Sequence, residues 1–131
     1  MSILNRWFEE VWNQGREATI DELLDPNVQG HGLIDPQGNE VTGIESFKVF
    51  WRVLRTALPD IHIDVLETVT EGNLSVARYV VTGKHTGEGI GKSPTGNPIV
   101  FTGMSMARVK DGKFIEVWNN IDFTTMYQQM K

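Results

Sequence analysis

The first half of the chain carries hydrophobic residues at the spacing of helices. One stripe consists of Ile3, Leu4, Trp7, Phe8, Val11 and Trp12, which lie on one side of a helix. A second stripe of apolar residues starts at Ile44, and Pro59 is expected to end it. Between the stripes, Thr19 and Glu22 have the spacing of a capping box, and Pro26 is expected to end that short helix. The sequence therefore predicts three N-terminal helices.

After Asp60 the hydrophobic period changes to two, which is the spacing of strands. A short strand is expected at 28–31, and longer strands are expected at 61–69, 74–85, 99–109 and 114–122. Helices followed by antiparallel strands are typical of the α+β class. We therefore predict an α+β fold in which a curved mixed or antiparallel sheet wraps around three N-terminal helices and encloses an apolar cavity.

The strands at 74–85 and 99–109 carry apolar side chains on both faces. The predicted helices can cover only one face of the sheet, and a bare apolar face would be exposed to water. A homodimer formed through the other face is therefore expected.

Glycine and proline residues crowd the segment between Thr86 and Pro98. This composition disfavours a regular helix or strand. We expect the segment to be a flexible loop that covers the cavity.

Composition narrows the possible functions. The chain has 131 residues, no cysteine and a formal net charge of −5. This length fits one domain, and the negative charge disfavours binding to nucleic acid or to anionic membranes. Without cysteine there is no disulfide or thiolate metal site, and no leader-like or membrane-spanning segment is recognisable. A cytoplasmic location is expected.

The predicted last strand ends in a carboxylate. Simple alternation places Phe114, Glu116, Trp118, Asn120 and Asp122 on one face of this strand. A carboxylate beside an aromatic face could transfer protons at the mouth of an apolar pocket. The alternative is that Asp122 lies on the surface and caps the segment after it.

Several motifs together resemble those of the SnoaL-like polyketide cyclases, also called ester cyclases. They are Gly83-Lys-His85-Thr-Gly87, Gly91-Lys-Ser-Pro94-Thr-Gly96, Gly112-Lys113, Glu116, Trp118 and Asp122, with Pro59-Asp60 and Gln129 as further matches. The resemblance covers nearly the whole chain, so residues 1–131 would form a single SnoaL-like domain. It implies the cone-shaped α+β fold of nuclear transport factor 2-like proteins. It also implies ring closure of a polyketide by intramolecular aldol condensation without metal or cofactor, with Asp122 as acid and base.

Two histidines are candidates to assist Asp122. His85, beside the Gly-rich loop, could donate to a substrate oxygen or orient the carboxylate, or it could be a capping histidine. His31, between two glycines, could approach a ligand closely or be a buried histidine bonded to backbone. A flat substrate could stack on Trp12, Phe47, Trp51, Met104 and Trp118, although these residues are equally typical of a core.

Three functions remain open. The first is a cofactor-free cyclase or isomerase that acts on a small aromatic or polyketide-like molecule. The second is a hydratase or epoxide hydrolase, which would need a second carboxylate near Asp122. The third is a module that binds small molecules or dimerises without catalysis. A cavity that contains Asp122 beside a histidine would favour the first, and a cavity without titratable groups would favour the third.

Overall fold

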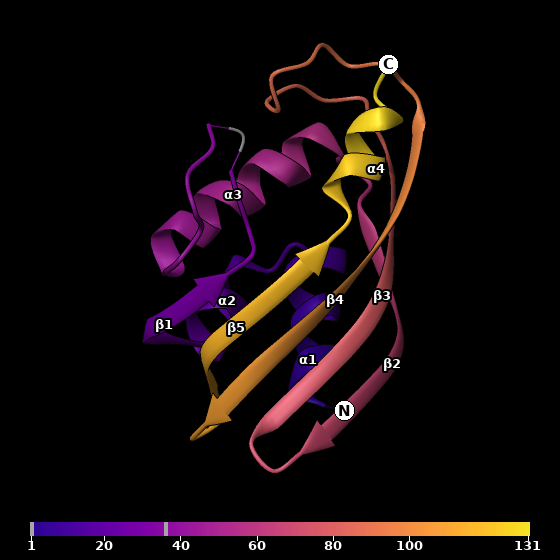
Figure 1. Cartoon of the computed structure of the whole chain (residues 1–131). Coiled ribbons are helices and arrows are strands. Elements are labelled where there is room, and N and C mark those ends of the chain that lie inside the picture. The colour runs from indigo at the N-terminus through magenta and orange to yellow at the C-terminus, as the bar shows by residue number, and fades with distance from the viewer. Residues whose placement is uncertain (1, 36) are drawn as a thin grey trace.

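The structure is a computed structural model that describes residues 2–35 and 37–131. Its elements are the helices α1 (Ile3–Trp7), α2 (Glu17–Leu23), α3 (Ile44–Ala57) and α4 (Phe123–Gln128), the π-helix η1 (Phe8–Asn13), and the strands β1 (Leu24–His31), β2 (His62–Glu71), β3 (Leu74–Lys84), β4 (Pro98–Lys110) and β5 (Lys113–Ile121) (Figure 1). The strands form one sheet in the order β1-β5-β4-β3-β2. The β1 strand is parallel to β5 and the other pairs are antiparallel. The predicted α+β fold with a mixed sheet is therefore confirmed.

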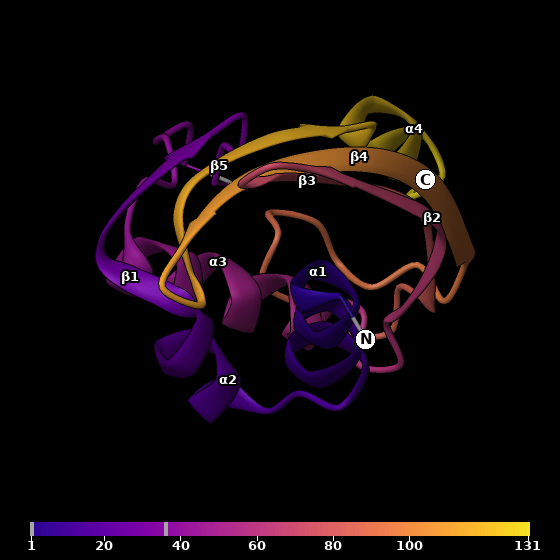
Figure 2. The ribbon, with the colours of Figure 1, turned by 90° about the horizontal axis from the view of Figure 1, so that it is seen from below.

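The sheet is strongly curved, and the helices α1 and α3 lie in its concave side (Figure 2). Every second residue of β3 and β4 points into this side and is buried: Ser75, Ala77, Tyr79, Val81, Ile99, Phe101, Gly103, Ser105 and Ala107. Exposed large hydrophobic residues lie on the opposite, convex face, where Val69, Val100 and Met104 are between 48% and 67% exposed. Within the described residues no helix is both long and apolar enough to cross a membrane.

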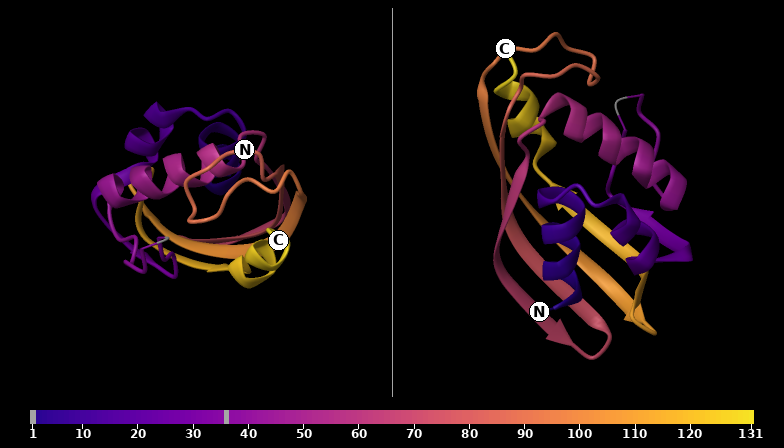
Figure 3. Two further views of the ribbon diagram at one scale, coloured as in Figure 1. Left: turned by 90° about the horizontal axis from the view of Figure 1, so that it is seen from above. Right: turned by 180° about the vertical axis from the view of Figure 1, so that it is seen from behind.

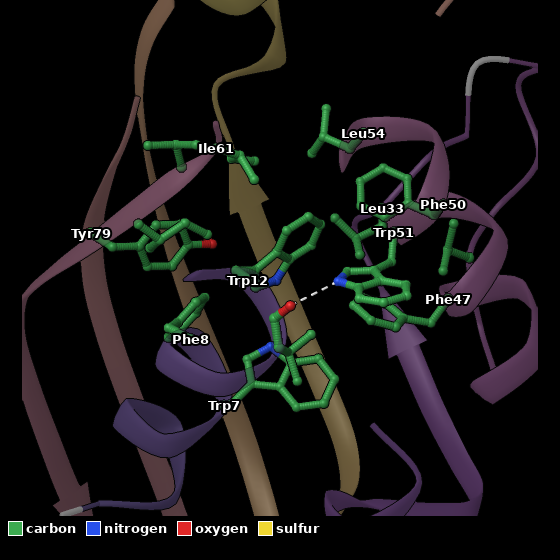
Figure 4. Packing of buried hydrophobic residues seen from close by; sticks show 14 of the residues in the cluster. Trp7, Phe8, Trp12, Leu33, Phe47, Phe50, Trp51, Leu54, Ile61 and Tyr79 are labelled. Atoms are coloured by element: carbon green, nitrogen blue, oxygen red, sulfur yellow. Dashed lines mark hydrogen bonds between the residues drawn. The ribbon is translucent and has the colours of Figure 1, made fainter. Parts of the chain in front are cut away.

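The first predicted helix forms, but its second half is wound as a π-helix. The Ser2 hydroxyl caps α1 by accepting from Asn5 N at 3.1 Å. Val11 lies in the last turn of η1, and its carbonyl accepts from the Trp51 indole at 2.9 Å (Figure 4). This buried hydrogen bond fastens α3 to η1.

The predicted capping box at Thr19 and Glu22 is wrong in detail. The α2 helix begins at Glu17, so Thr19 lies inside it, buried, and its hydroxyl donates to Glu10 at 2.7 Å. At the start of α3 the N-cap is Gly43, whose amide donates to the Ser46 hydroxyl at 3.0 Å. At Thr19 the contact with Glu10 of η1 therefore overrides the local pattern, whereas the cap of α3 is made locally by Ser46.

A β-bulge in β5 changes which residues face the helices. Phe114 is opposite Val109, but the next paired residue is Glu116, opposite Arg108, so Ile115 is an extra residue. After the bulge the alternation is shifted by one position. The concave face receives Phe114, Val117, Asn119 and Ile121, whereas Glu116, Trp118, Asn120 and Asp122 lie on the convex face. The predicted common face for Phe114 and Asp122 is therefore wrong.

Candidate functional site

An apolar cavity of about 80 Å³ lies between the concave face of the sheet and the helices. Its aromatic walls come mainly from the helical segments: Trp7, Phe8, Trp12, Phe47 and Phe50. Trp12 and Phe47 thus lie where the sequence placed them, and their contact with a ligand stays a prediction. The volume has room for several waters.

The exposed fraction of the lining residues locates the mouth of the cavity. Most lining residues are buried, but Gly30, Thr42, Gly43, Val117, Asn119, Ile121 and Phe123 are partly or fully exposed. The mouth therefore lies between the segment 30–43 and the end of β5 with the start of α4. No lining residue comes from the loop 86–98, so the prediction that this loop covers the cavity is wrong in the observed conformation.

Three neutral polar side chains form a hydrogen-bonded chain in the cavity wall, which we call the polar triad: Tyr79, Ser105 and Asn119. The Tyr79 hydroxyl lies 2.8 Å from Ser105 Oγ, and Ser105 Oγ donates to Asn119 Oδ1 at 2.7 Å. The Asn119 amide in turn donates to the backbone carbonyl of His31 at 3.3 Å. In Figure 4 the Tyr79 hydroxyl points toward Trp12, into the packed aromatic cluster.

Neighbouring strands hold the triad in place. Tyr79 pairs across the sheet with Gly103, and a Cβ at position 103 would lie 2.7 Å from the Tyr79 ring. Glycine is thus required for the ring to lie flat over β4. The other side of the ring packs on Phe8 with the two ring centroids 4.5 Å apart. Asn119 reaches the cavity only because the bulge at Ile115 turns it inward.

The cavity wall is electrically neutral. Burial raises the pKa of the Tyr79 hydroxyl to about 12, so this group stays protonated at ordinary pH. None of the lining residues, all within the described part of the chain, is an aspartate, a glutamate or a histidine. The arrangement can hydrogen-bond a ligand oxygen, but it presents no carboxylate or imidazole to it.

Asp122 does not lie in the cavity, which corrects the predicted placement. Its side chain is exposed and is the N-cap of α4, where it accepts from Thr125 N at 3.0 Å and from the Thr125 hydroxyl at 2.6 Å. These hydrogen bonds, first from the side chain and then from the backbone of Thr125, lower the pKa of the Asp122 carboxyl. A low pKa makes this group a weak base.

His31 and Trp118 lie together on the convex face. Their rings stack with centroids 5.7 Å apart, and His31 Nε2 lies 2.8 Å from Glu116 Oε2. The predicted position of Trp118 on the cavity wall is wrong because the bulge turns it outward. Only the backbone of His31 reaches the polar triad.

His85 is fully buried outside the cavity lining, so it does not meet Asp122 or the polar triad. Its Nδ1 lies 3.1 Å from the Thr95 hydroxyl, and its Nε2 has no partner among the described residues. The loop that follows it is fastened by Gly87 N, which donates to Ala57 O at 3.1 Å, and by the Asn97 amide, which donates to Gln129 O at 3.0 Å. Figure 3 shows this loop beside the C-terminal end of the chain.

Two further predicted substrate contacts have other positions. Trp51 is buried in the core beside η1 but is not among the cavity-lining residues, and Met104 is 48% exposed on the convex face. Sequence reasoning missed Ser105 and Asn119. Ser105 could have been found as a polar residue among the inward positions of its strand, between Phe101 and Ala107.

Comparison with known proteins agrees with this architecture. Residues 2–130 match the sequence model of the SnoaL-like polyketide cyclases. IdmH of Streptomyces antibioticus, described as a proposed polyketide cyclase, is 30% identical with a TM-score of 0.83, over 97% of this chain and 94% of that one. Comparison with curated proteins gives no match.

Two more distant structures share the fold. A proposed SnoaL-like polyketide cyclase from Jannaschia sp. CCS1 is 24% identical with a TM-score of 0.84, over 98% of this chain and 88% of that one. AclR of Streptomyces galilaeus, described as a proposed hydroxylase, is 24% identical with a TM-score of 0.82, over 97% and 78% of the two chains. The family match spans nearly the whole chain, and the fold agrees with it. This protein therefore belongs to the SnoaL-like polyketide cyclase family.

Proposed function

We propose that the protein binds a small, largely apolar, polyketide-like molecule in its cavity, with an oxygen of the ligand against the polar triad. The observation that carries this proposal is the hydrogen-bonded chain Tyr79–Ser105–Asn119 in an otherwise apolar wall. Apolar walls favour burial of a ring, and a few fixed polar groups orient it. Three hydrogen-bonded polar groups in series beside an apolar cavity fit ligand recognition.

A titration followed by amide NMR tests this proposal. With 1-phenylethanol as the probe, amide shifts are expected at residues around the cavity, and the Ala107→Leu variant should lose binding because the larger side chain fills the cavity. Met106→Leu is the matched control, since the neighbouring side chain points to the convex face. Unchanged binding by a folded Ala107→Leu protein would contradict the proposal.

A second candidate function is ring closure or isomerisation of such a molecule without a cofactor. The family match and the likeness to IdmH favour it. The cavity supplies hydrogen bonds to an enol or enolate oxygen but no base, so the roles of Asp122, His85 and His31 as proton-transfer groups stay predictions. A hydratase or epoxide hydrolase has less support, because a carboxylate pair beside water is required and the lining has none.

Hydrogen–deuterium exchange separates binding from proton transfer. If the protein catalyses enolisation, it should speed exchange of the central protons of 1-phenylbutane-1,3-dione, and the Ala107→Leu variant should not. If Asp122→Asn slows this exchange by about 10²–10⁴, which is the loss typical of a general base, the result would support Asp122 as the base. An unchanged rate in Asp122→Asn would assign Asp122 to helix capping alone.

We also propose that the protein is a homodimer through the convex face. An apolar row crosses the sheet there, in which Val69 pairs with Val76, Val76 with Met106, and Met106 with Trp118. Val69 is exposed and the other three side chains are half-buried, which favours a covering partner, and a second copy offers the same surface by symmetry.

Light scattering at micromolar concentration tests the dimer. A mass of about twice the 14.8 kDa chain is expected, and Met104→Glu should shift it toward the monomer by burying a charge. Thr56→Glu, on an exposed position of α3, is the control that should leave the mass unchanged. A mass of one chain for the unmodified protein would contradict the dimer.

A further inference from the structure

The hydrogen-bond direction within the polar triad follows from one backbone carbonyl. A carbonyl oxygen can only accept, so the Asn119 atom that faces His31 O at 3.3 Å is the amide nitrogen. This fixes the orientation of the side-chain amide and turns Asn119 Oδ1 toward Ser105, at 2.7 Å from Ser105 Oγ. The opposite orientation would bring two carbonyl oxygens together.

The orientation of Asn119 fixes the other two protons. Oδ1 can only accept, so the single proton of Ser105 is committed to it. Ser105 Oγ can then only accept a hydrogen bond from Tyr79. The Tyr79 hydroxyl must therefore donate its proton to Ser105 Oγ across the 2.8 Å contact. The protons therefore point in one direction, from Tyr79 to Ser105 to Asn119.

We propose that the Tyr79 end of the triad presents a hydrogen-bond acceptor to the cavity, so that the preferred ligand carries a hydroxyl donor, as phenols, alcohols and enolised 1,3-dicarbonyls do. This rests on the proposed binding function and narrows its ligand class. The proton of Tyr79 is used on Ser105, which leaves a lone pair of the Tyr79 oxygen for the ligand. A plain ketone would place its own lone pairs against that oxygen.

Burial makes this preference strong. Tyr79 is 1% exposed and Ser105 is 4% exposed, so water does not compete freely for their oxygens. An acceptor that faces another acceptor in such a place loses a hydrogen bond and gains repulsion. Discrimination of about tenfold between donor and acceptor ligands is expected, which corresponds to one buried neutral hydrogen bond.

The matched probes 1-phenylethanol and acetophenone have the same heavy atoms, but only the alcohol carries a hydroxyl proton, and the ketone oxygen can only accept. The unmodified protein should bind the alcohol about tenfold more tightly than the ketone. In Ser105→Ala the Tyr79 proton loses its acceptor and becomes free for the ligand, so the preference should reverse toward the ketone. In Tyr79→Phe the tyrosine oxygen is absent and only the lone pairs of Ser105 remain as acceptors, so the preference for the alcohol should weaken. Thr102→Ala, exposed on the convex face of the same strand, should behave like the unmodified protein.

Equal affinities, or a preference for the ketone in the unmodified protein, would overturn the proposal while the cavity remained a binding site. Loss of binding for both probes would instead overturn the proposed function. If the unmodified protein prefers the alcohol and Ser105→Ala prefers the ketone, the result would support both the proposed binding function and the proposed preference for a donor ligand.

The proton direction can also be measured without ligand. The chain has two tyrosines, so a Tyr127→Phe background leaves Tyr79 as the single tyrosine in the Raman spectrum. The intensity ratio of the tyrosine Fermi doublet distinguishes a hydroxyl that donates from one that accepts. A donor signature that is lost in Ser105→Ala would support the proposed direction. An acceptor signature in the unmodified triad would overturn it, whatever the ligands do.

Discussion

The concave and the convex face of the sheet differ in which polar groups they hold. The concave face buries the neutral hydroxyls of Tyr79 and Ser105, whereas the convex face carries ion pairs such as Arg78 with Glu67, whose closest atoms are 2.7 Å apart. Ionised groups remain where water solvates them, and neutral groups that satisfy each other can be buried. The cavity therefore offers a bound molecule neutral hydrogen-bonding groups and no charged ones.

A single extra residue, Ile115, decides which side chains of β5 face the cavity. Without the bulge at Ile115, Asp122 and Trp118 would share the concave face with Phe114. With it, the carboxylate caps α4 in water and Asn119 takes the inward position. The same sequence therefore gives a neutral cavity in place of an acidic one.

The largest expected effect on stability is the difference between substitutions at two adjacent residues, one on each face of the sheet. Phe101→Ala should lower the free energy of unfolding by about 3–5 kcal/mol, because it leaves a hole in the concave core. Thr102→Ala, exposed on the convex face, should cost less than about 1 kcal/mol. Urea unfolding of both variants measures the difference, and similar losses would contradict the assignment of the faces.

Gly103→Ala should cost about 1–3 kcal/mol, because the added methyl group meets the Tyr79 ring. A double-mutant cycle with Tyr79→Leu gives the measurement. In the leucine background the flat ring is absent, so the same change at position 103 should cost clearly less. Additive losses would show that the ring does not need the glycine.

High pH should destabilise the protein through Tyr79. The pKa of its buried hydroxyl is raised to about 12, above the value of about 10 in an unfolded chain. The stabilisation is therefore fully present below pH 10 and is lost as the pH rises toward 12, by about 1.4 kcal/mol at pH 11. Tyr79→Phe should lack this loss, and unfolding experiments at pH 9 and pH 11 compare the two proteins. An equal pH dependence in both would exclude Tyr79 as its source.

The smallest expected effect belongs to Asp122. Its pKa is lowered in the folded protein by the Thr125 hydrogen bonds, so its charge stabilises α4 above the unfolded pKa and this contribution is lost as the pH falls through the folded pKa. Asp122→Asn keeps the cap and should lose only the acid-dependent part, whereas Asp122→Ala should lose the cap as well. Thermal unfolding between pH 3 and pH 7 measures this order. An Asp122→Asn protein that differs from the parent equally at all pH values would contradict it.

Much of the architecture was determined by the sequence alone. The apolar stripes at 3–12 and 44–58 predict the helices, and the change to a period of two predicts the strands, because burial of one face imposes these spacings on any chain. The same stripes place Trp12 and Phe47 in the interior, but periodicity does not distinguish a cavity wall from a filled core. The alternation along β3 likewise places Tyr79 with Val81 on one face.

Tertiary structure decided which polar residues meet in the cavity. The bulge at Ile115 arises from pairing between β4 and β5, and no local residue pattern marks it. The triad joins residues from three strands, and its proton direction depends on a carbonyl of β1, which is parallel to β5 and far from it in sequence. Local periodicity reports which face is apolar, whereas register and long-range hydrogen bonds decide what chemistry that face presents.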